Sequence, residues 1–321
     1  MLKQSHPNPG PLMPTLLFAA GPALWPEYQH CLPEALAEAG IKATILLETT
    51  CPETVDYIIF APGGTVTDFT PFTRCKAVLS LWAGVEKYVG NPTLTQPLAR
   101  MVNPDLTEGM VEYVVGHVLR LHLGMDRYLQ DGVWRNHILP PLARERTVAV
   151  LGLGELGRAS AQALAALRFK VAGWSQSARD LPGVSCFSGP DGLDKALSQA
   201  EIAVLLLPLT PDTTNLLDAR RLALMPAGAA ILNPGRGALI DDAALLAALE
   251  AGQISHATLD VFRTEPLPPD HPYWAHPRVT VTPHVAADTR AGSAARVLAE
   301  NIRRGEAGEP LLYLVDKTRG Y

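Results

Sequence analysis

The amino-acid sequence predicts an α/β protein of two lobes, one of which is a Rossmann dinucleotide-binding domain. Short apolar and β-branched runs alternate with helical segments, a pattern typical of parallel sheets with crossover helices. One such run, residues 147–151, leads into a Gly-x-Gly-x-x-Gly motif at 152–157, and a helical pattern follows at once. A chain of 321 residues is long enough for about two domains.

The glycine motif is the most informative stretch of the sequence. Its first glycine permits a tight strand-to-helix turn, its second lets backbone N–H groups approach a pyrophosphate, and its third lets the helix pack close to the strand. A lone motif of this kind is weak evidence, but here the strand before it and the helix after it favour dinucleotide binding. The residues expected to contact the cofactor at this turn are Gly152, Gly154, Glu155, Leu156 and Gly157.

The N-terminal part of the chain reads as a separate α/β lobe without a glycine fingerprint. After a tail at 1–14, buried strands are expected at residues 15–20, 43–47, 55–60 and 77–81. A helix is expected at 32–39, because Gly40 stands in the usual position after a helix end.

The last of these strands runs into a turn of small residues, which comprises Trp82, Ala83, Gly84 and Val85. Ligands of open α/β sheets bind at the carboxyl ends of strands, so backbone N–H groups here are able to hold a small anion. An ordinary strand-to-loop turn explains the same residues equally well. Residues 91–105 contain three prolines and are expected to cross between the lobes, and a long amphipathic helix is expected from 110 to 125.

The strand–helix alternation is regular after the glycine motif. Asp241 is expected to cap a helix that stops at Gly252, and a final amphipathic helix is expected at 289–304, before residues 311–315. The strands of this lobe are expected at 169–174, 202–207, 229–233, 257–262 and 279–282.

Polar residues follow these strands one after another. In a doubly wound sheet the carboxyl ends of the strands open onto one crevice, so these side chains should converge there. They are Ser175 and Gln176, Thr210 after Pro208, Arg236, Asp260 with Glu265, and His284.

This set matches the needs of hydride transfer to a carbonyl. The guanidinium of Arg236 is suited to clamping a carboxylate and polarising a carbonyl. His284 is suited to exchanging the alcohol proton, and Glu265 to orienting and charging the imidazole. Each residue taken singly also has a structural explanation, as a turn, loop or packing residue, and the combination with the glycine turn favours catalysis.

Composition narrows the class of protein. A net charge of −5 provides no basic surface for nucleic acid. The four cysteines lack paired spacing, so they are expected to be reduced thiols of a cytoplasmic protein without a metal site. No apolar run is long enough to cross a membrane, and the N-terminus lacks the basic and apolar regions of a secretory signal.

The sequence resembles the D-isomer-specific 2-hydroxyacid dehydrogenases. The matching motifs are Gly-Leu-Gly-Glu-Leu-Gly, Asn-Pro-Gly-Arg-Gly, Leu-Asp-Val-Phe-Arg-Thr-Glu-Pro-Leu and Val-Thr-Pro-His-Val-Ala, between 152 and 286. Within that family, Ser-Leu-Trp-Ala-Gly-Val at 80–85 and His-Pro-Tyr-Trp-Ala-His-Pro-Arg-Val at 271–279 look most like the glyoxylate/hydroxypyruvate reductase A branch.

The resemblance implies a catalytic set of Arg236, Glu265 and His284, with the backbone at 82–85 holding the substrate carboxylate. Asp260 would contact the nicotinamide amide. The resemblance also implies that a dinucleotide-binding domain, residues 98–287, is inserted into a flavodoxin-like substrate domain made of 1–97 and 288–321. A homodimer built on the dinucleotide-binding domains follows from the same resemblance.

The sequence departs from the common NAD-binding pattern after the second Rossmann strand. An acid usually stands there to accept from the ribose hydroxyls, but no acid occurs before Asp180. A turn that carries hydroxyls and an arginine fits a 2′-phosphate better, which favours NADPH, with NAD as a possible second cofactor. The residues expected at this phosphate are Ser175, Gln176, Ser177 and Arg179.

The sequence therefore predicts an NADPH-preferring reductase that converts small 2-oxo acids, such as glyoxylate or hydroxypyruvate, to D-2-hydroxy acids. A family enzyme for another substrate, such as phosphoglycerate, is an alternative. Formate enzymes of the family carry Gln where Glu265 stands, which argues against formate. A third alternative is a non-enzymatic, dinucleotide-sensing protein like the corepressors that share this fold.

Overall fold

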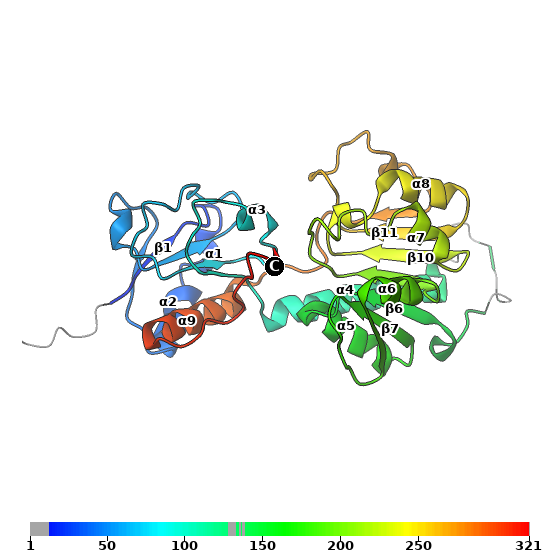
Figure 1. Ribbon diagram of the computed structural model, residues 1–321, viewed down its shortest axis with the longest axis horizontal. Coiled ribbons are helices and arrows are strands. Elements are labelled where there is room, and N and C mark those ends of the chain that lie inside the picture. The colour runs from blue at the N-terminus through cyan, green and yellow to red at the C-terminus, as the bar shows by residue number, and fades with distance from the viewer. Residues whose placement is uncertain (1–12, 128–132, 135, 137–138, 321) are drawn as a thin grey trace, which may run out of the picture. The chain divides into compact units, whose positions relative to one another are not determined.

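The computed structural model describes residues 13–127, 133–134, 136 and 139–320. The chain divides into two compact units, which are described one at a time (Figure 1). Unit 1 comprises Met1–Pro104 and Thr289–Tyr321, and unit 2 comprises Asp105–Asp288. Most of the tail predicted at 1–14 lies outside the described residues.

Unit 1 is built on a five-stranded parallel sheet with the order β2-β1-β3-β4-β5. This order is that of flavodoxin-like folds. The strands are β1 (Thr15–Phe18), β2 (Thr44–Leu46), β3 (Tyr57–Phe60), β4 (Ala77–Ser80) and β5 (Leu98–Ala99).

Helices pack on one face of this sheet, among them α2 and α9, which lie side by side in Figure 1. Small residues of α9, such as Ala294 and Ala295, are fully buried there and allow close packing. The opposite face is covered mainly by loop residues such as Phe69 and Phe72. The helices of unit 1 are α1 (Trp25–Tyr28), α2 (Cys31–Glu38), α3 (Glu86–Val89) and α9 (Ala291–Ala307).

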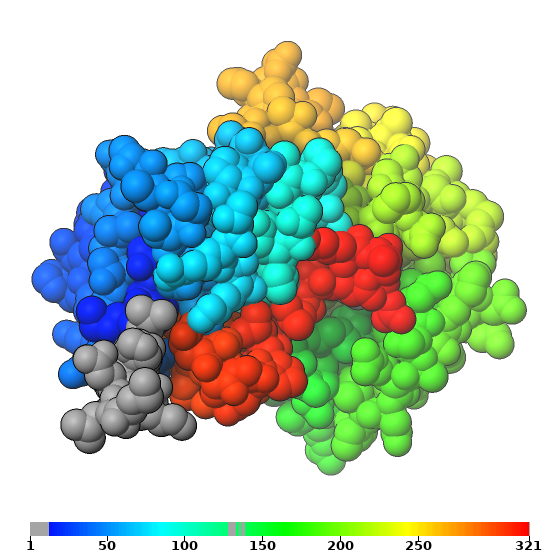
Figure 2. Space-filling view, turned by 60° about the vertical axis from the view of Figure 1, so that its left-hand side comes forward, coloured from blue at the N-terminus to red at the C-terminus, as the bar shows by residue number. Residues whose placement is uncertain are grey.

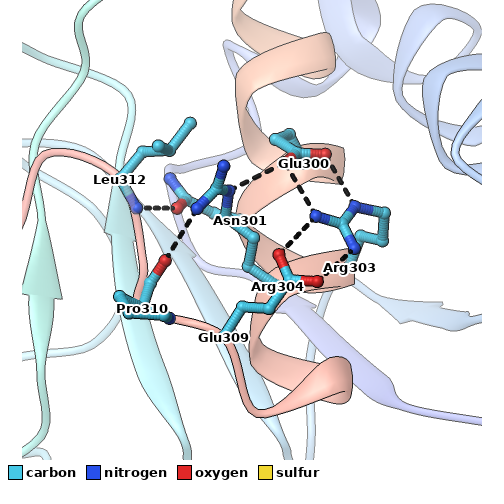
Figure 3. Close-up of polar contacts among 7 residues, drawn as sticks. All are labelled: Glu300, Asn301, Arg303, Arg304, Glu309, Pro310 and Leu312. Atoms are coloured by element: carbon cyan, nitrogen blue, oxygen red, sulfur yellow. Dashed lines mark hydrogen bonds and ion pairs between the residues drawn. The ribbon is translucent and has the colours of Figure 1, made fainter.

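The segment after α9 returns to the edge of the sheet, where Leu314 forms an antiparallel bridge with Ala99. In Figure 2 this red segment lies beside cyan residues, in agreement with hydrogen bonds from Lys317 Nζ to the carbonyl oxygens of Leu94 and Gln96. Figure 3 shows how the turn is held: the buried Asn301 accepts from the Leu312 N–H at 2.7 Å.

Charged groups at the end of α9 reinforce this turn. Arg303 bridges Glu300 at 2.9 Å and Glu309 at 2.6 Å, and Arg304 also contacts Glu300, at 2.8 Å (Figure 3). These ion pairs are partly exposed, so each contributes little alone, but they share Glu300 and form a network.

Unit 2 is a seven-stranded parallel sheet with the order β12-β11-β10-β9-β6-β7-β8. The reversal of strand order at β6 is the switch point of a Rossmann fold. The strands are β6 (Thr147–Leu151), β7 (Lys170–Ser175), β8 (Val184–Ser188), β9 (Ile202–Leu205), β10 (Ala229–Asn233), β11 (Ile254–Leu259) and β12 (Val279–Val281).

Helices cover both faces of the unit 2 sheet. The helices α4 (Pro104–Leu123) and α5 (Glu155–Ala166) pack on one face. The other face carries α6 (Gly189–Leu197), α7 (Ala219–Leu224) and α8 (Asp242–Glu250). Short 3-10 turns occur at η1 (Pro52–Thr54), η2 (Met125–Arg127), η3 (Ala143–Glu145), η4 (Gly237–Leu239) and η5 (Pro272–Trp274).

The predicted α/β class with an inserted Rossmann fold is confirmed. The Asp241 cap is also present, because its side chain accepts from the Ala244 N–H at 2.9 Å. Two strands differ from the prediction. β5 lies within 91–105, where only a crossing was expected, because prolines interrupt its short apolar pairs. The edge strand β8 was missed because half-exposed serine and cysteine residues give it no apolar run.

Within the part of the chain that the structure describes, no helix is long and apolar enough to cross a membrane.

Candidate active site

The glycine turn between β6 and α5 requires glycine at two of its three positions. Gly152 has φ +102°, and a Cβ there would lie 2.4 Å from the Leu206 carbonyl oxygen. A Cβ on Gly157 would lie 1.7 Å from the Gly152 carbonyl oxygen. A Cβ on Gly154, in contrast, would have no other heavy atom within 4 Å. No side chain caps the first turn of α5. The turn therefore offers uncapped N–H groups and the room for a phosphate.

A pocket of about 360 Å³ lies beside this turn, and it is bounded by α5 and by the segment that follows β7. Its lining includes Arg179, which the sequence analysis singled out, and Arg158, which it did not. Arg158 Nη2 pairs with Glu155 Oε2 at 2.7 Å, one helical turn earlier. The position of Arg158 directly after the third glycine did not by itself indicate this role, because the role depends on the segment after β7, which bounds the same pocket. The pocket is lined by Leu153, Gly154, Glu155, Arg158, Ala178, Arg179, Asp180 and Leu181.

The turn after β7 is shaped by its own hydroxyl group. Ser175 is buried, and its Oγ donates to the Ser177 carbonyl oxygen at 2.7 Å. The side chains of Gln176 and Ser177 are exposed. The turn after β9 is likewise folded on itself, because Thr213 Oγ donates to the Pro208 carbonyl oxygen at 2.8 Å and accepts from the Thr210 N–H at 2.8 Å.

Arg236 stands in a turn that a buried asparagine holds. Asn233, the last residue of β10, donates from Nδ2 to the Arg236 carbonyl oxygen at 2.9 Å and accepts from the Gly235 N–H at 3.1 Å. Sequence reasoning placed Asn233 in the strand but missed this role, because the role depends on the path of the following turn. The Arg236 side chain is half-buried, and its Nη1 donates to the Gly235 carbonyl oxygen.

Glu265 and His284, which the sequence analysis expected to act together, are in contact. Nδ1 of His284 lies 2.9 Å from Oε2 of Glu265. The other carboxylate oxygen, Oε1, accepts from the Phe262 N–H at 2.8 Å. Nδ1 is thus engaged by the carboxylate, which leaves Nε2 as the ring nitrogen free to exchange a proton with a substrate.

Asp260 lies directly after β11 and is fully buried. Its carboxylate accepts from the Thr282 hydroxyl at 2.6 Å and from the N–H groups of Val285 and Ala286, each at 2.9 Å. The Tyr113 hydroxyl in turn lies 2.7 Å from Thr282 Oγ1. Asp260 is therefore bonded to residues on both sides of His284.

The turn at 82–85 belongs to unit 1 and is described there alone. The Ser80 hydroxyl donates to the Trp82 carbonyl oxygen at 3.0 Å and accepts from the Trp82 N–H at 3.1 Å, which bends the chain as β4 ends. The Trp82 side chain is 45% exposed, Ala83 and Gly84 are half-buried, and Val85 is buried.

These features define an NAD(P)-dependent oxidoreductase: a Rossmann glycine turn, and an imidazole–carboxylate pair that follows strands of the same sheet. The family model described as "D-isomer specific 2-hydroxyacid dehydrogenase, NAD binding domain" matches residues 113–286, which is more than half of the chain. The chain belongs to the D-isomer specific 2-hydroxyacid dehydrogenase family.

Solved structures of similar proteins agree. A D-isomer specific 2-hydroxyacid dehydrogenase from Xanthobacter autotrophicus Py2, in complex with NADPH and MES, is 39% identical with a TM-score of 0.89, over 97% of this chain and 100% of that one. An NADPH-dependent glyoxylate/hydroxypyruvate reductase from Sinorhizobium meliloti, in complex with NADP and sulfate, is 33% identical with a TM-score of 0.82, over 97% and 100% of the two chains. A probable 2-hydroxyacid dehydrogenase from Rhizobium etli CFN 42, in complex with NADP, HEPES and L(+)-tartaric acid, is 30% identical with a TM-score of 0.84, over 96% and 99%.

Proposed function

We propose that the protein is an NADPH-preferring reductase that converts small 2-oxo acids, such as glyoxylate and hydroxypyruvate, to D-2-hydroxy acids. The observation that carries this proposal is the contact of 2.9 Å between His284 and Glu265 on the fold of a dinucleotide-binding domain. The similar protein from Sinorhizobium meliloti, an NADPH-dependent glyoxylate/hydroxypyruvate reductase, supports the choice of substrate.

The residues present fit a dinucleotide. The open space at Gly154 and the uncapped start of α5 suit the pyrophosphate, with Glu155, Leu156 and Gly157 around it. Two arginines, Arg158 and Arg179, line the pocket beside it and suit a 2′-phosphate. Ser175, Gln176, Ser177, Pro208, Thr210 and Asp260 complete the proposed cofactor contacts.

The chemistry that bound NADPH supplies is the donation of a hydride to the keto carbon. We assign Arg236 to the substrate carboxylate and carbonyl oxygen, since its planar fork of donors suits both groups. The backbone of Ala83, Gly84 and Val85, beside Trp82, would also hold the carboxylate.

His284 acts as the acid. Its Nε2 donates a proton to the carbonyl oxygen as the carbonyl is reduced, while Glu265 holds Nδ1 and orients the ring. In the direction of oxidation, the same nitrogen removes the hydroxyl proton.

The proposal extends to the organisation of the chain. We assign dinucleotide binding to unit 2, for which the sequence predicted residues 98–287, and substrate binding to unit 1, for which it predicted 1–97 and 288–321. The N-terminal boundary of unit 2 lies later than predicted, because β5 at 98–99 pairs with β4 in the unit 1 sheet. We further propose a homodimer in the cytoplasm. The four cysteines, Cys31, Cys51, Cys75 and Cys186, are free thiols, which suits a reducing compartment.

The test is the loss of NADPH absorbance with a panel of 2-oxo acids. We expect turnover of glyoxylate and hydroxypyruvate. Reduction of the 2-oxo acid that corresponds to 3-phosphoglycerate, in preference to glyoxylate and hydroxypyruvate, would favour the alternative enzyme. Tight NADPH binding without turnover of any panel member would favour a dinucleotide-sensing protein.

A further inference from the structure

We propose that Arg263 is a positioning residue that ties the segment of Glu265 to the turn of Arg236. The inference rests on the proposed function and names a residue that acts through Glu265, by anchoring its segment to the turn of Arg236. The chemistry of hydride transfer does not by itself require an arginine at this position.

The guanidinium of Arg263 contacts three separate acceptors. Its Nε lies 3.1 Å from Asp242 Oδ2, in the first turn of α8. Its Nη2 donates to Asn215 Oδ1 and to the Ile240 carbonyl oxygen. Ile240 and Asp242 belong to one segment, between η4 and α8, and Asn215 belongs to another, so the side chain connects two segments of unit 2.

The acceptors surround the turn that begins at Arg236. Ile240 directly follows η4 (Gly237–Leu239), for which Arg236 is the N-cap residue. The Asn215 N–H donates to the Ala238 carbonyl oxygen at 2.8 Å, within the same turn. The partner of Arg263 at α8 is itself fixed, because Asp242 Oδ1 accepts from the Tyr273 hydroxyl at 2.9 Å.

The segment on the other side of Arg263 carries Glu265. Glu265 Oε1 accepts from the Phe262 N–H, and the Phe262 backbone packs directly on Gly237, where a Cβ would lie 2.1 Å from the Phe262 carbonyl carbon. Arg263 therefore stands between the residue that packs on the Arg236 turn and the residue that orients His284. Without its contacts, the segment 262–265 would lose its side-chain tie to the Arg236 turn.

An ordinary surface ion pair would explain only the contact with Asp242, and such pairs contribute little. The contact with the Ile240 carbonyl oxygen argues for a positioning role, because it joins Arg263 to the backbone of the Arg236 turn. The planar guanidinium suits three acceptors in fixed directions, whereas the point charge of lysine does not.

The test compares Arg263→Ala and Arg263→Lys with a control, Arg220→Ala. Arg220 forms a partly exposed ion pair of 2.7 Å with Asp194 in the same unit, and neither residue is assigned to the proposed site. With glyoxylate and NADPH we expect Arg263→Ala to lower kcat by about ten- to a hundredfold, as misplacement of a reacting group does. The Kd for NADPH should change less than about twofold, Arg263→Lys should be intermediate, and Arg220→Ala should match wild type.

A double variant separates positioning from a general structural role. If Arg263 acts through Glu265, then Arg263→Ala/Glu265→Gln should be no slower than Glu265→Gln alone. Independent, multiplying losses would overturn the proposal, as would a wild-type kcat in Arg263→Ala. An unaltered kcat in Glu265→Gln would instead remove the proposed role of Glu265, and the inference with it.

A measurement without substrate gives a second readout. In nitrogen-15 spectra of histidine-labelled apoprotein, the His284 ring signals, assigned by their loss in His284→Ala, should move in Arg263→Ala in the same direction as in Glu265→Gln. Ring signals in Arg263→Ala identical to those of wild type would overturn the proposal even if the activity falls.

Discussion

Asp260 fixes the backbone of His284 through hydrogen bonds of its carbonyl oxygen and its carboxylate. The His284 N–H donates to the Asp260 carbonyl oxygen at 2.8 Å, and the Asp260 carboxylate holds residues on both sides of His284. His284 has φ +54°, in the left-handed region that residues other than glycine adopt at a cost. The hydrogen bonds of Asp260 offset this cost and hold the proposed acid in one conformation.

The first prediction concerns that anchor. Asp260→Asn leaves one acceptor oxygen and adds an amide donor that faces N–H groups, so at least one buried bond is lost. We expect the free energy of unfolding of the apoprotein to fall by about 1–3 kcal/mol and kcat to fall with it. Denaturant unfolding checks the first effect, with Asp270→Asn, an exposed residue, as control. An unchanged stability with weaker NADPH binding would indicate that the carboxylate serves the nicotinamide instead.

The second prediction concerns Arg236. Its fork of donors would contact the carboxylate and the developing oxyanion, so Arg236→Ala should lower kcat/KM by at least about a hundredfold, or roughly 2.7 kcal/mol. The Kd for NADPH should hardly change. Near-normal turnover in this variant would remove Arg236 from the catalytic set.

The third prediction concerns the pair of Glu265 and His284. The Glu265 carboxylate lies 2.9 Å from His284 Nδ1 and so orients the ring that we assign as the acid. Glu265→Gln should therefore lower kcat for glyoxylate by about ten- to a hundredfold, as misplacement of a reacting group does, while the Kd for NADPH hardly changes. His284→Ala is the control for loss of the acid. A wild-type kcat in Glu265→Gln would show that His284 works without Glu265.

The fourth prediction concerns the choice of cofactor. Arg158 and Arg179 line the pocket beside the glycine turn, and a charged hydrogen bond to phosphate contributes about 1.5–3 kcal/mol. We expect at least about tenfold preference for NADPH over NADH in kcat/KM, and Arg158→Ala and Arg179→Ala should each erode it. Lys195→Ala, exposed on α6, is the control. Equal rates with both cofactors in the wild type would refute the preference. If only one of the two variants loses the preference for NADPH, that arginine is the one that binds the 2′-phosphate.

The fifth prediction concerns acid stability. Hydrogen bonds from Arg303 and then Arg304 lower the pKa of Glu300 to about 2. Because the folded pKa lies below the unfolded value of about 4.3, this stabilisation is present above that value and is lost as pH falls toward 2. Glu300→Gln should therefore lower the free energy of unfolding at neutral pH by about 0.5–1 kcal/mol after solvent screening. This difference in stability between the variant and the wild type should become smaller as the pH falls. Thermal unfolding as a function of pH measures the gap, and a constant gap would contradict the prediction.

Features set by local sequence were predictable. The glycine turn, the cap at Asp241 and the glycine after α2 each depend on neighbouring residues, and each is where the sequence indicated. The convergence of Glu265 with His284 was also predictable, because parallel strands deliver their following residues to one edge of a sheet.

Features set by distant partners were not predictable. Arg263 binds residues 48 and 23 positions away in the sequence, and no local pattern specifies those contacts. β8 lies at the edge of its sheet and is half-exposed, so it lacks the apolar run that marks a central strand. Arg158 was overlooked because its importance depends on the segment after β7, which bounds the same pocket.

The discontinuity of unit 1 has a consequence for biosynthesis. Its strands are made first, but α9, which supplies Ala294, Ala295 and Leu298 to its core, is made after all of unit 2. A nascent chain with residues 1–288 outside the ribosome thus contains every segment of unit 2, whereas the unit 1 sheet still exposes apolar surface and an unpaired edge at β5. We therefore expect unit 2 to complete its folding before unit 1, although unit 1 is translated first. Chaperones would then bind the emerging chain at the N-terminal sheet.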